Sequence, residues 1–138
     1  MKKIILFMAI VAICLQACKP KYADGVLPQI VGSWELKESK PTIDSVWKPL
    51  PYKPNMVVVF NKDGSLVVGG DFHFPFTGGS CNTANKYRIK NNIMYLEFEE
   101  ERCIRFFAFS FSNEVKIISF SDNELVLGRG GLYKFVRI

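Results

Sequence analysis

Histidine is nearly absent from this chain of 138 residues, because His73 is the single one. No second histidine completes a metal site or serves as the base for a nucleophile. Gly128-Arg129-Gly130-Gly131 lacks the Gly-Lys-Ser/Thr ending of a phosphate-binding loop, and no Gly-x-Ser-x-Gly nucleophile elbow occurs. We therefore expect no catalytic residue, no metal site and no cofactor, and the chain is predicted not to be an enzyme.

A large charge of one sign is also missing. The formal net charge is +5, and removal of Lys2 and Lys3 with a leader would leave 16 basic against 13 acidic side chains. This small excess argues against a nucleic-acid partner. Hydrophobic residues make up 49% and charged residues 22% of the chain, which is typical of one folded domain.

The first 17 residues have the features of a secretory signal. Lys2 and Lys3 precede an uninterrupted apolar run from Ile4 to Leu15. That run is shorter than the roughly 20 residues that a bilayer span requires. Leu15-Gln16-Ala17-Cys18 resembles the bacterial lipobox, which implies cleavage before Cys18 and a lipid on its thiol. The alternative is an ordinary signal with a cleavage site nearby and a spare thiol.

Residues 18–29 are predicted to be the lipidated N-terminus and a short tether, because Pro and Gly interrupt them without any apolar period. Lys19 follows the modified cysteine, where an aspartate is associated with retention in the inner membrane. We therefore expect a lipid-anchored protein of the bacterial cell envelope, on the outer membrane and facing the periplasm.

Residues 30–138 are predicted to form an all-β domain. Apolar residues alternate with period two, and Asn, Asp and Gly punctuate the chain at short intervals. Short links favour an antiparallel meander, and closure into a barrel of about 8–10 short strands would remove exposed edges. A two-sheet sandwich is the alternative. The expected strands are Ile30–Lys37, Met56–Phe60, Ser65–Val68, Asp71–Phe76, Asn85–Lys90, Ile93–Glu99, Ile104–Phe111, Val115–Phe120, Glu124–Leu127 and Leu132–Arg137.

Two hairpins have a predictable register. A two-residue turn at Asn91-Asn92 pairs Ile89 with Met94, and places Tyr87, Ile89, Met94, Leu96 and Phe98 on one dry face. A three-residue turn at Ser121–Asn123 pairs Ile117 with Leu127 and Ser119 with Leu125.

Cys81 and Cys103 are the two thiols left after processing and lipidation. An exported chain usually oxidises such a pair, so a disulfide is predicted. The hairpin register sets Cys81 opposite Arg102, and one bulge within Glu99-Glu100-Glu101 would bring Cys103 into line. The alternative is two free thiols in flanking loops.

Gly32-Ser33-Trp34 resembles the Gly-x-Trp opening of lipocalins. Together with Trp47-Lys48-Pro49 and the closing Tyr133-Lys134-Phe135-Val136-Arg137, the region Ile30 to Ile138 is similar to small lipocalin-like lipoproteins of Bacteroidetes. This resemblance implies that Trp34 lies across the base of a barrel beneath Arg137. Trp47 should then be much more exposed than Trp34. A second resemblance, to META-domain lipoproteins, is carried by Gly79-Ser80-Cys81-Asn82 and ranks behind the first.

Two functions are consistent with such a barrel. A barrel of about eight strands is either filled by side chains or just wide enough for one small ligand. The first prediction is a small apolar ligand bound inside a monomeric barrel by the ring-bearing residues Trp34, Phe72, Phe74, Tyr87, Phe98, Phe107 and Phe109. The alternative is a protein-binding module, an inhibitor or assembly accessory, that uses the loops Pro41–Pro54 and Phe76–Asn82. A cavity would favour the ligand, and a filled interior would favour the loops.

Overall fold

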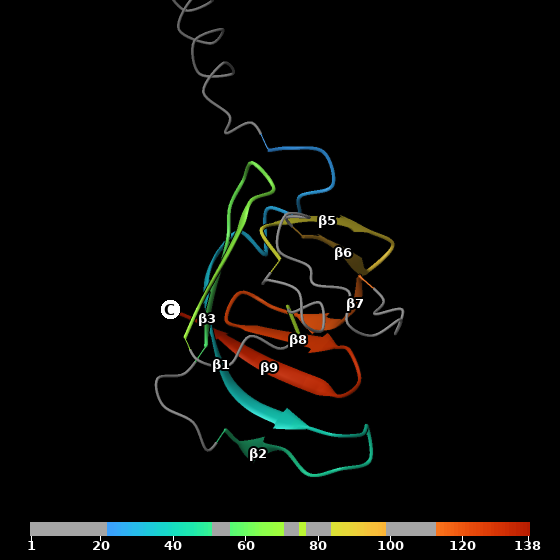
Figure 1. The fold of residues 1–138 in the computed structure, drawn as a ribbon. Helices are drawn as coiled ribbons and strands as arrows, with labels where there is room; N and C mark the ends of the chain where they lie inside the picture. The colour runs from blue at the N-terminus through green and yellow to red at the C-terminus, as the bar shows by residue number, and fades with distance from the viewer. Residues whose placement is uncertain (1–21, 51–55, 71–74, 77–83, 99–112) are drawn as a thin grey trace, which may run out of the picture.

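A computed structural model describes residues 22–50, 56–70, 75–76, 84–98 and 113–138. These ranges form an all-β structure of nine antiparallel strands, which confirms the predicted fold class (Figure 1). No helix in them is long and apolar enough to cross a bilayer. The strands are β1 Gly32–Lys40, β2 Lys48–Pro49, β3 Val57–Phe60, β4 Leu66–Gly69, β5 Lys86–Lys90, β6 Ile93–Glu97, β7 Glu114–Phe120, β8 Glu124–Gly128 and β9 Leu132–Arg137.

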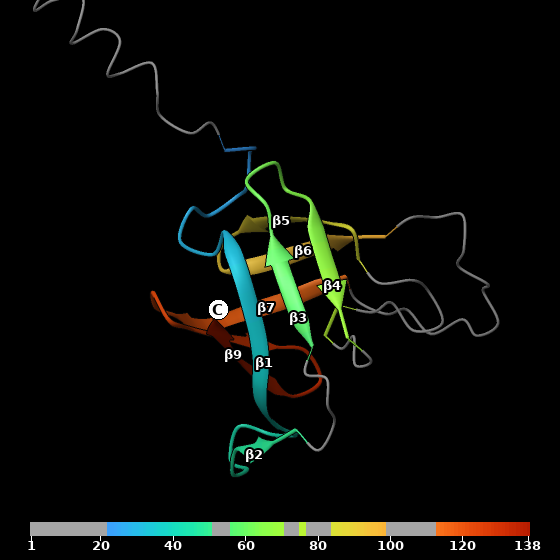
Figure 2. The ribbon, with the colours of Figure 1, turned by 90° about the vertical axis from the view of Figure 1, so that its left-hand side faces the viewer.

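The sheet is a meander that is nearly closed into a barrel (Figures 1 and 2). Its order is β4-β3-β1-β9-β8-β7-β6-β5, so the last strand returns to pair with the first. The seam between β4 and β5 is joined by a single bridge, Ser65 to Lys86. Beside it, Leu66 N donates to Asn85 O (2.7 Å) and Tyr87 N donates to Gly64 O (2.9 Å). The weakest closure of the described barrel therefore lies at this seam.

The predicted register of the β5–β6 hairpin is confirmed. Ile89 pairs with Met94, and Tyr87 pairs with Leu96. Asn91 and Asn92 have φ angles of 53° and 58°, the left-handed conformation that a two-residue turn of type I′ requires. Because asparagine tolerates this conformation, the two turn residues alone set the pairing of both strands.

The β7–β8 register is only partly as predicted. Ile117 pairs with Leu127, but the expected pairing of Ser119 with Leu125 is wrong. A bulge at Ile118 sets Ser119 against Val126 instead. The side chain of Ile118 lies against Gly128. A Cβ at position 128 would be only 3.2 Å from Ile118 Cδ1, so the glycine leaves the space that this side chain needs.

Other strand predictions have mixed outcomes. Of the expected strand Asp71–Phe76, the structure describes Pro75 and Phe76, which form a turn. The expected strand Ile104–Phe111 lies outside the described residues. Strand β2, inside a segment expected to be a loop, pairs with β1 through Glu38–Pro49 and Ser39–Lys48.

The predicted tether of residues 18–29 differs from the structure in its described part. Ala23 N donates to Lys62 O (2.8 Å), and Ile89 N donates to Gly25 O (2.6 Å). The side chain of Val26 is buried. This segment packs against the barrel because its few apolar side chains reach the core. The sequence of this segment has no hydrophobic periodicity from which this contact could be predicted. The described residues from Tyr22 onward therefore pack against the barrel.

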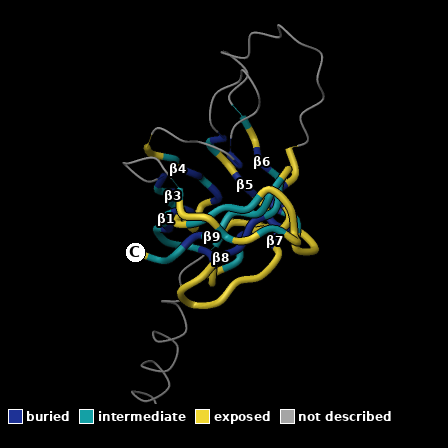
Figure 3. Tube along the Cα trace, turned by 90° about the horizontal axis from the view of Figure 1, so that it is seen from below, coloured by how far each residue is buried: buried dark blue, intermediate teal, exposed yellow. Residues whose placement is uncertain are grey.

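The described strands carry buried residues that form one hydrophobic core, and Figure 3 colours the chain by this burial. In β5 and β6, alternate residues are buried, as the period-two pattern predicts. Each large apolar side chain that is fully buried stabilises the fold by about 1.5–3 kcal/mol. The largest of these side chains are Trp34, Phe60, Phe76, Phe135, Ile30, Leu36, Met56, Met94, Leu96, Leu125, Leu127 and Val58.

Candidate functional site

Arg137 covers Trp34 where the end of β9 pairs with the start of β1. The guanidinium carbon of Arg137 is 4.2 Å from the centroid of the indole ring. Trp34 is 0% exposed, and its Nε1 donates to Ile30 O (2.7 Å). The stacking that the Gly-x-Trp resemblance implied is therefore present.

The guanidinium of Arg137 is also tied to the backbone of two neighbouring segments. Its Nε donates to Asp122 O (2.6 Å), its Nη1 to Val31 O (3.0 Å) and its Nη2 to Gln29 O. Gly32 has φ +136°, and a Cβ there would lie 2.7 Å from Nη1 of Arg137. Glycine is needed at this position both for its conformation and for the space. These contacts close one end of the barrel.

Aromatic rings meet edge to face inside the barrel. The centroid of Phe60 is 5.0 Å from that of Tyr87 and 5.9 Å from that of Phe76. Phe76 in turn lies 6.0 Å from Phe135. The Tyr87 hydroxyl donates to Asn61 O (2.9 Å), and burial raises the pKa of this phenol. Four aromatic rings therefore pack against one another in the described core.

The seven predicted ligand-binding residues fall into three groups. Trp34 and Tyr87 are buried members of the hydrophobic core. Phe98 is half-buried and packs against the core just after β6. The remaining four, Phe72, Phe74, Phe107 and Phe109, lie outside the described residues.

Other predicted positions also lie outside the described residues. These are the signal of residues 1–17, Cys18, His73, Cys81, Cys103 and the expected bulge within Glu99-Glu100-Glu101. Within the ranges that are described, no group of three or more His, Cys, Asp or Glu side chains could hold a metal ion.

The connection from β1 to β2 carries two exposed apolar side chains at its tip. Ile43 is 72% and Val46 is 77% exposed. Lys40 Nζ donates to Ile43 O (2.7 Å), and the hydroxyls of Thr42 and Ser45 are hydrogen-bonded (2.6 Å). The tip is thus held in shape by its own hydrogen bonds while its apolar groups face solvent. We call residues 40–49 the β1–β2 hairpin.

Trp47 forms the base of this hairpin. Its ring centroid is 5.0 Å from Lys40 Nζ and 4.4 Å from Lys134 Nζ. Lys134 also forms an ion pair with Glu38. Trp47 is half-buried, so the prediction that it is more exposed than Trp34 is confirmed. The sequence offered no sign that two lysines would hold its ring.

Two half-buried polar side chains lie near each other, Arg129 just after β8 and Tyr133 on β9. Arg129 Nη1 donates to Pro75 O, and burial lowers the pKa of this guanidinium. Burial also raises the pKa of the Tyr133 hydroxyl, an effect that the nearby Arg129 opposes. The contact with Pro75 gives Arg129 a structural role between β8 and the segment before β5.

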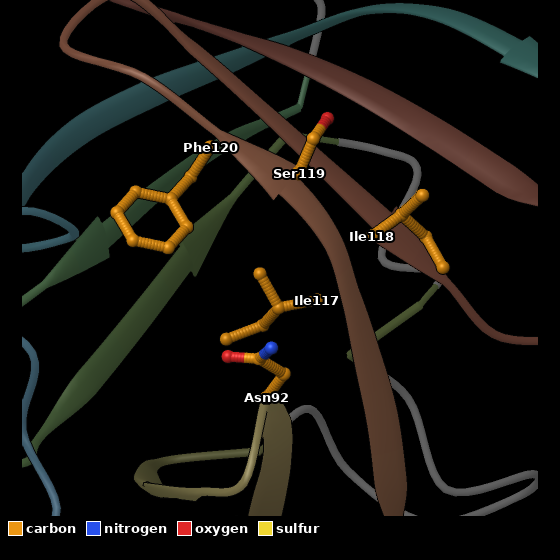
Figure 4. Close-up of a pocket in the computed structure, with 5 residues that line it drawn as sticks. All are labelled: Asn92, Ile117, Ile118, Ser119 and Phe120. Carbon is orange, nitrogen blue, oxygen red and sulfur yellow. The ribbon is translucent and has the colours of Figure 1, made fainter.

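A shallow hollow of about 190 Å³ lies beside the bulge of β7 (Figure 4). It is lined by Asn92, Ile117, Ile118, Ser119 and Phe120, and none of these side chains is an acid, a base or an activated nucleophile. In Figure 4, Phe120 and Ile118 point to opposite sides of the strand. The hollow therefore has a shaped surface with apolar side chains but no catalytic group.

Similarity to known proteins is slight. No family model matches this chain, and no curated protein matches it. A crystal structure of an uncharacterized protein from Bacteroides eggerthii DSM 20697 is similar over 79% of this chain and 99% of that chain, with 17% sequence identity and a TM-score of 0.41.

Proposed function

We propose that this protein is a lipid-anchored, non-catalytic binding module of the bacterial envelope that recognises another protein through the β1–β2 hairpin. Cys18 carries the lipid, and the barrel faces the periplasm from the outer membrane. The observation that carries the proposal is a contrast in burial. Aromatic and aliphatic side chains pack together in the described interior, whereas Ile43 and Val46 are the most exposed large apolar side chains of the described residues.

The place of the hairpin supports this role. In Figures 1 and 2, β2 lies at one end of the molecule and the described chain starts at the opposite end. A lipid on Cys18 would therefore leave the hairpin pointing away from the membrane. Exposed apolar groups on a shaped tip are suited to a pocket on a partner, where such anchors supply much of the binding energy.

A photo-crosslinking amino acid placed at Val46 in living cells tests the proposal. We expect one adduct of discrete mass, and its loss when Ile43→Ser is added. The matched control places the same probe at Val67, which is 57% exposed on β4, where no adduct should form. Equal adducts at both positions, or none at Val46, would contradict a hairpin interface.

The anchor has its own test. Cys18→Ser should abolish incorporation of labelled palmitate and move the protein from the membrane fraction to the soluble fraction. A variant that still labels and still sediments with membranes would show that Cys18 is not the modified residue.

A disulfide between Cys81 and Cys103 belongs to the same proposal, because an exported domain gains stability from it. We expect a stabilisation of about 3 kcal/mol on the chain-entropy model. Thiol titration of the unfolded, unreduced protein should find neither cysteine reactive. Two reactive thiols would exclude the bond.

A small apolar ligand inside the barrel is the second candidate. Phe98 favours it, because this half-buried ring continues the apolar face of β6 beyond the packed core. Native mass spectrometry of the protein purified from its envelope should then show a small-molecule adduct that Phe98→Ala weakens. A spectrum with the protein mass alone would leave the hairpin as the binding site.

A further inference from the structure

The outer face of β5 carries three cationic side chains in a row. Lys86, Arg88 and Lys90 are all exposed, and they alternate with the buried Tyr87 and Ile89. Arg88 is held over the ring of Tyr95 on β6, with 5.6 Å from its guanidinium carbon to the ring centroid. The backbone of β5 therefore places the three cations on one face, and the ring of Tyr95 holds the middle one.

One cation on β7 extends this face. Lys90 pairs with Ile93 on β6, and Ile93 pairs in turn with the exposed Lys116 on β7. Lys90 and Lys116 therefore flank one position of the middle strand. The basic surface thus crosses three strands at this level.

The start of the described chain lies along this strand. Gly25 O accepts a hydrogen bond from Ile89 N (2.6 Å), and a Cβ at Gly25 would lie 3.1 Å from the Cβ of Arg88. In Figures 1 and 2, β5 is at the same end of the molecule as the start of the described chain. The basic row and the start of the described chain thus share one end of the barrel.

The link from Cys18 to the barrel is short. Tyr22 already packs against the core, and it follows Cys18 by four residues. Four residues span at most about 14 Å even when fully extended. Because the screening length in salt is about 8–10 Å, an anchored barrel keeps Tyr22 within about two screening lengths of the membrane.

We propose that the outer face of β5 rests on the anionic phosphate headgroups of the membrane that holds Cys18, so that the anchored barrel adopts one orientation. This inference rests on the lipid anchor of the proposed function and adds the surface that the membrane contacts. The attraction is to distributed negative charge, as for basic segments close to a membrane anchor.

Acidic groups at the same end limit the strength of the attraction. Glu97 lies opposite Lys86 in the β5–β6 ladder, and Asp24 and Asp63 are exposed near the chain start and the β3–β4 turn. Glu114 is also exposed on β7, where it pairs with Tyr95. The described cations of this end are Lys62, Lys86, Arg88, Lys90 and Lys116, five against four acidic groups. This small excess of positive charge is suited to orienting a domain that a lipid already anchors. It is not suited to binding an unanchored domain to the membrane.

Single-hit acetylation of lysines, read by peptide mass spectrometry, tests the orientation. The acylated full chain is placed in vesicles of phosphatidylcholine with phosphatidylglycerol, in vesicles of phosphatidylcholine alone, or in detergent. We expect acetylation of Lys86 and Lys90 to fall about threefold in the anionic vesicles compared with detergent. Lys48, exposed on β2 at the far end, serves as the internal control and should not change.

Two variants distinguish protection caused by the positive charge of β5 from protection caused only by nearness to the membrane. Lys86→Gln combined with Arg88→Gln should restore acetylation of Lys90, whereas the matched Lys48→Gln should leave Lys90 protected. If Lys86 and Lys90 are protected from acetylation equally in vesicles with and without phosphatidylglycerol, the role of charge is overturned. If Lys48 and Lys90 react equally in an acylated, membrane-bound chain, only the proposed orientation is overturned. If the purified chain lacks the mass of the acyl groups, both the lipid anchor and this inference are overturned.

Discussion

Both tryptophans of this chain lie beneath cations, yet they sit in regions of opposite character. At the closed end, Trp34 is fully buried under Arg137, whose guanidinium also donates to three backbone carbonyls. At the β1–β2 hairpin, Trp47 is half-buried between the ammonium groups of Lys40 and Lys134. Strand β1 connects the two regions.

The difference shows how one type of contact serves two purposes. The planar guanidinium of Arg137 can stack on a ring and donate several hydrogen bonds at once, so it joins separate segments at the closed end. The two lysines carry compact charges and are only partly exposed, so they steady the ring of Trp47 without joining separate segments by hydrogen bonds to the backbone. The first region stabilises the barrel, and the second region holds a surface in shape.

The largest expected effect is that of Trp34→Ala. Removing this fully buried indole should lower the free energy of unfolding by about 3–5 kcal/mol, because it leaves a cavity at the closed end and removes the surface on which Arg137 stacks. Urea denaturation followed by circular dichroism measures it, since the substitution removes one of the two fluorescent indoles. A midpoint equal to that of the wild type would mean that the closed end does not stabilise the barrel.

Gly32→Ala tests the same region without removing an aromatic ring. The new Cβ would have to occupy a φ of +136° and approach Nη1 of Arg137 to 2.7 Å. We expect a loss of about 1–3 kcal/mol from backbone strain and displaced hydrogen bonds. The matched control is Gly69→Ala, where the nearest atom to the new Cβ is 3.9 Å away. Similar losses at both glycines would argue against crowding at Arg137.

Trp47→Ala should cost far less than Trp34→Ala. The ring is half-buried, and its two cation contacts are partly solvated, so about 1 kcal/mol is expected. The same urea titration measures the change. A loss as large as that of Trp34→Ala would abolish the contrast between the two regions and give the hairpin a structural role.

The smallest effect concerns pH at the β3–β4 turn. Hydrogen bonds from the hydroxyl and backbone N–H of Ser65 hold the pKa of the Asp63 carboxyl below its usual value of 3.8. A lowered folded-state pKa stabilises the protein above the unfolded pKa, and this contribution disappears as pH falls through the folded-state value. Stability should therefore decline below about pH 4, and less so in Ser65→Ala. Urea midpoints at neutral and acid pH measure this, and identical acid losses in both proteins would contradict it.

Local chemistry was enough to predict most of the described strands and the β5–β6 turn. The side chains of Asn91 and Asn92 permit the left-handed turn, and alternation in Tyr87–Ile89 and Met94–Leu96 then decides which face is buried. Most strands start or end within a few residues of their predicted bounds, because period two and turn residues are properties of short segments. The closed end could be placed only through the Gly-x-Trp resemblance.

The amino-acid sequence by itself determined the all-β class and the β5–β6 register, and the Gly-x-Trp resemblance indicated the greater burial of Trp34 than of Trp47. Tertiary structure alone decided the bulge at Ile118, the docking of Gly25 beside Arg88 and the clamp of two lysines on Trp47. The physical reason is the range of the interactions. Alternation and turn conformation depend on neighbours along the chain, whereas a bulge, a docked segment or a cation over a ring depends on residues that meet only when the barrel closes.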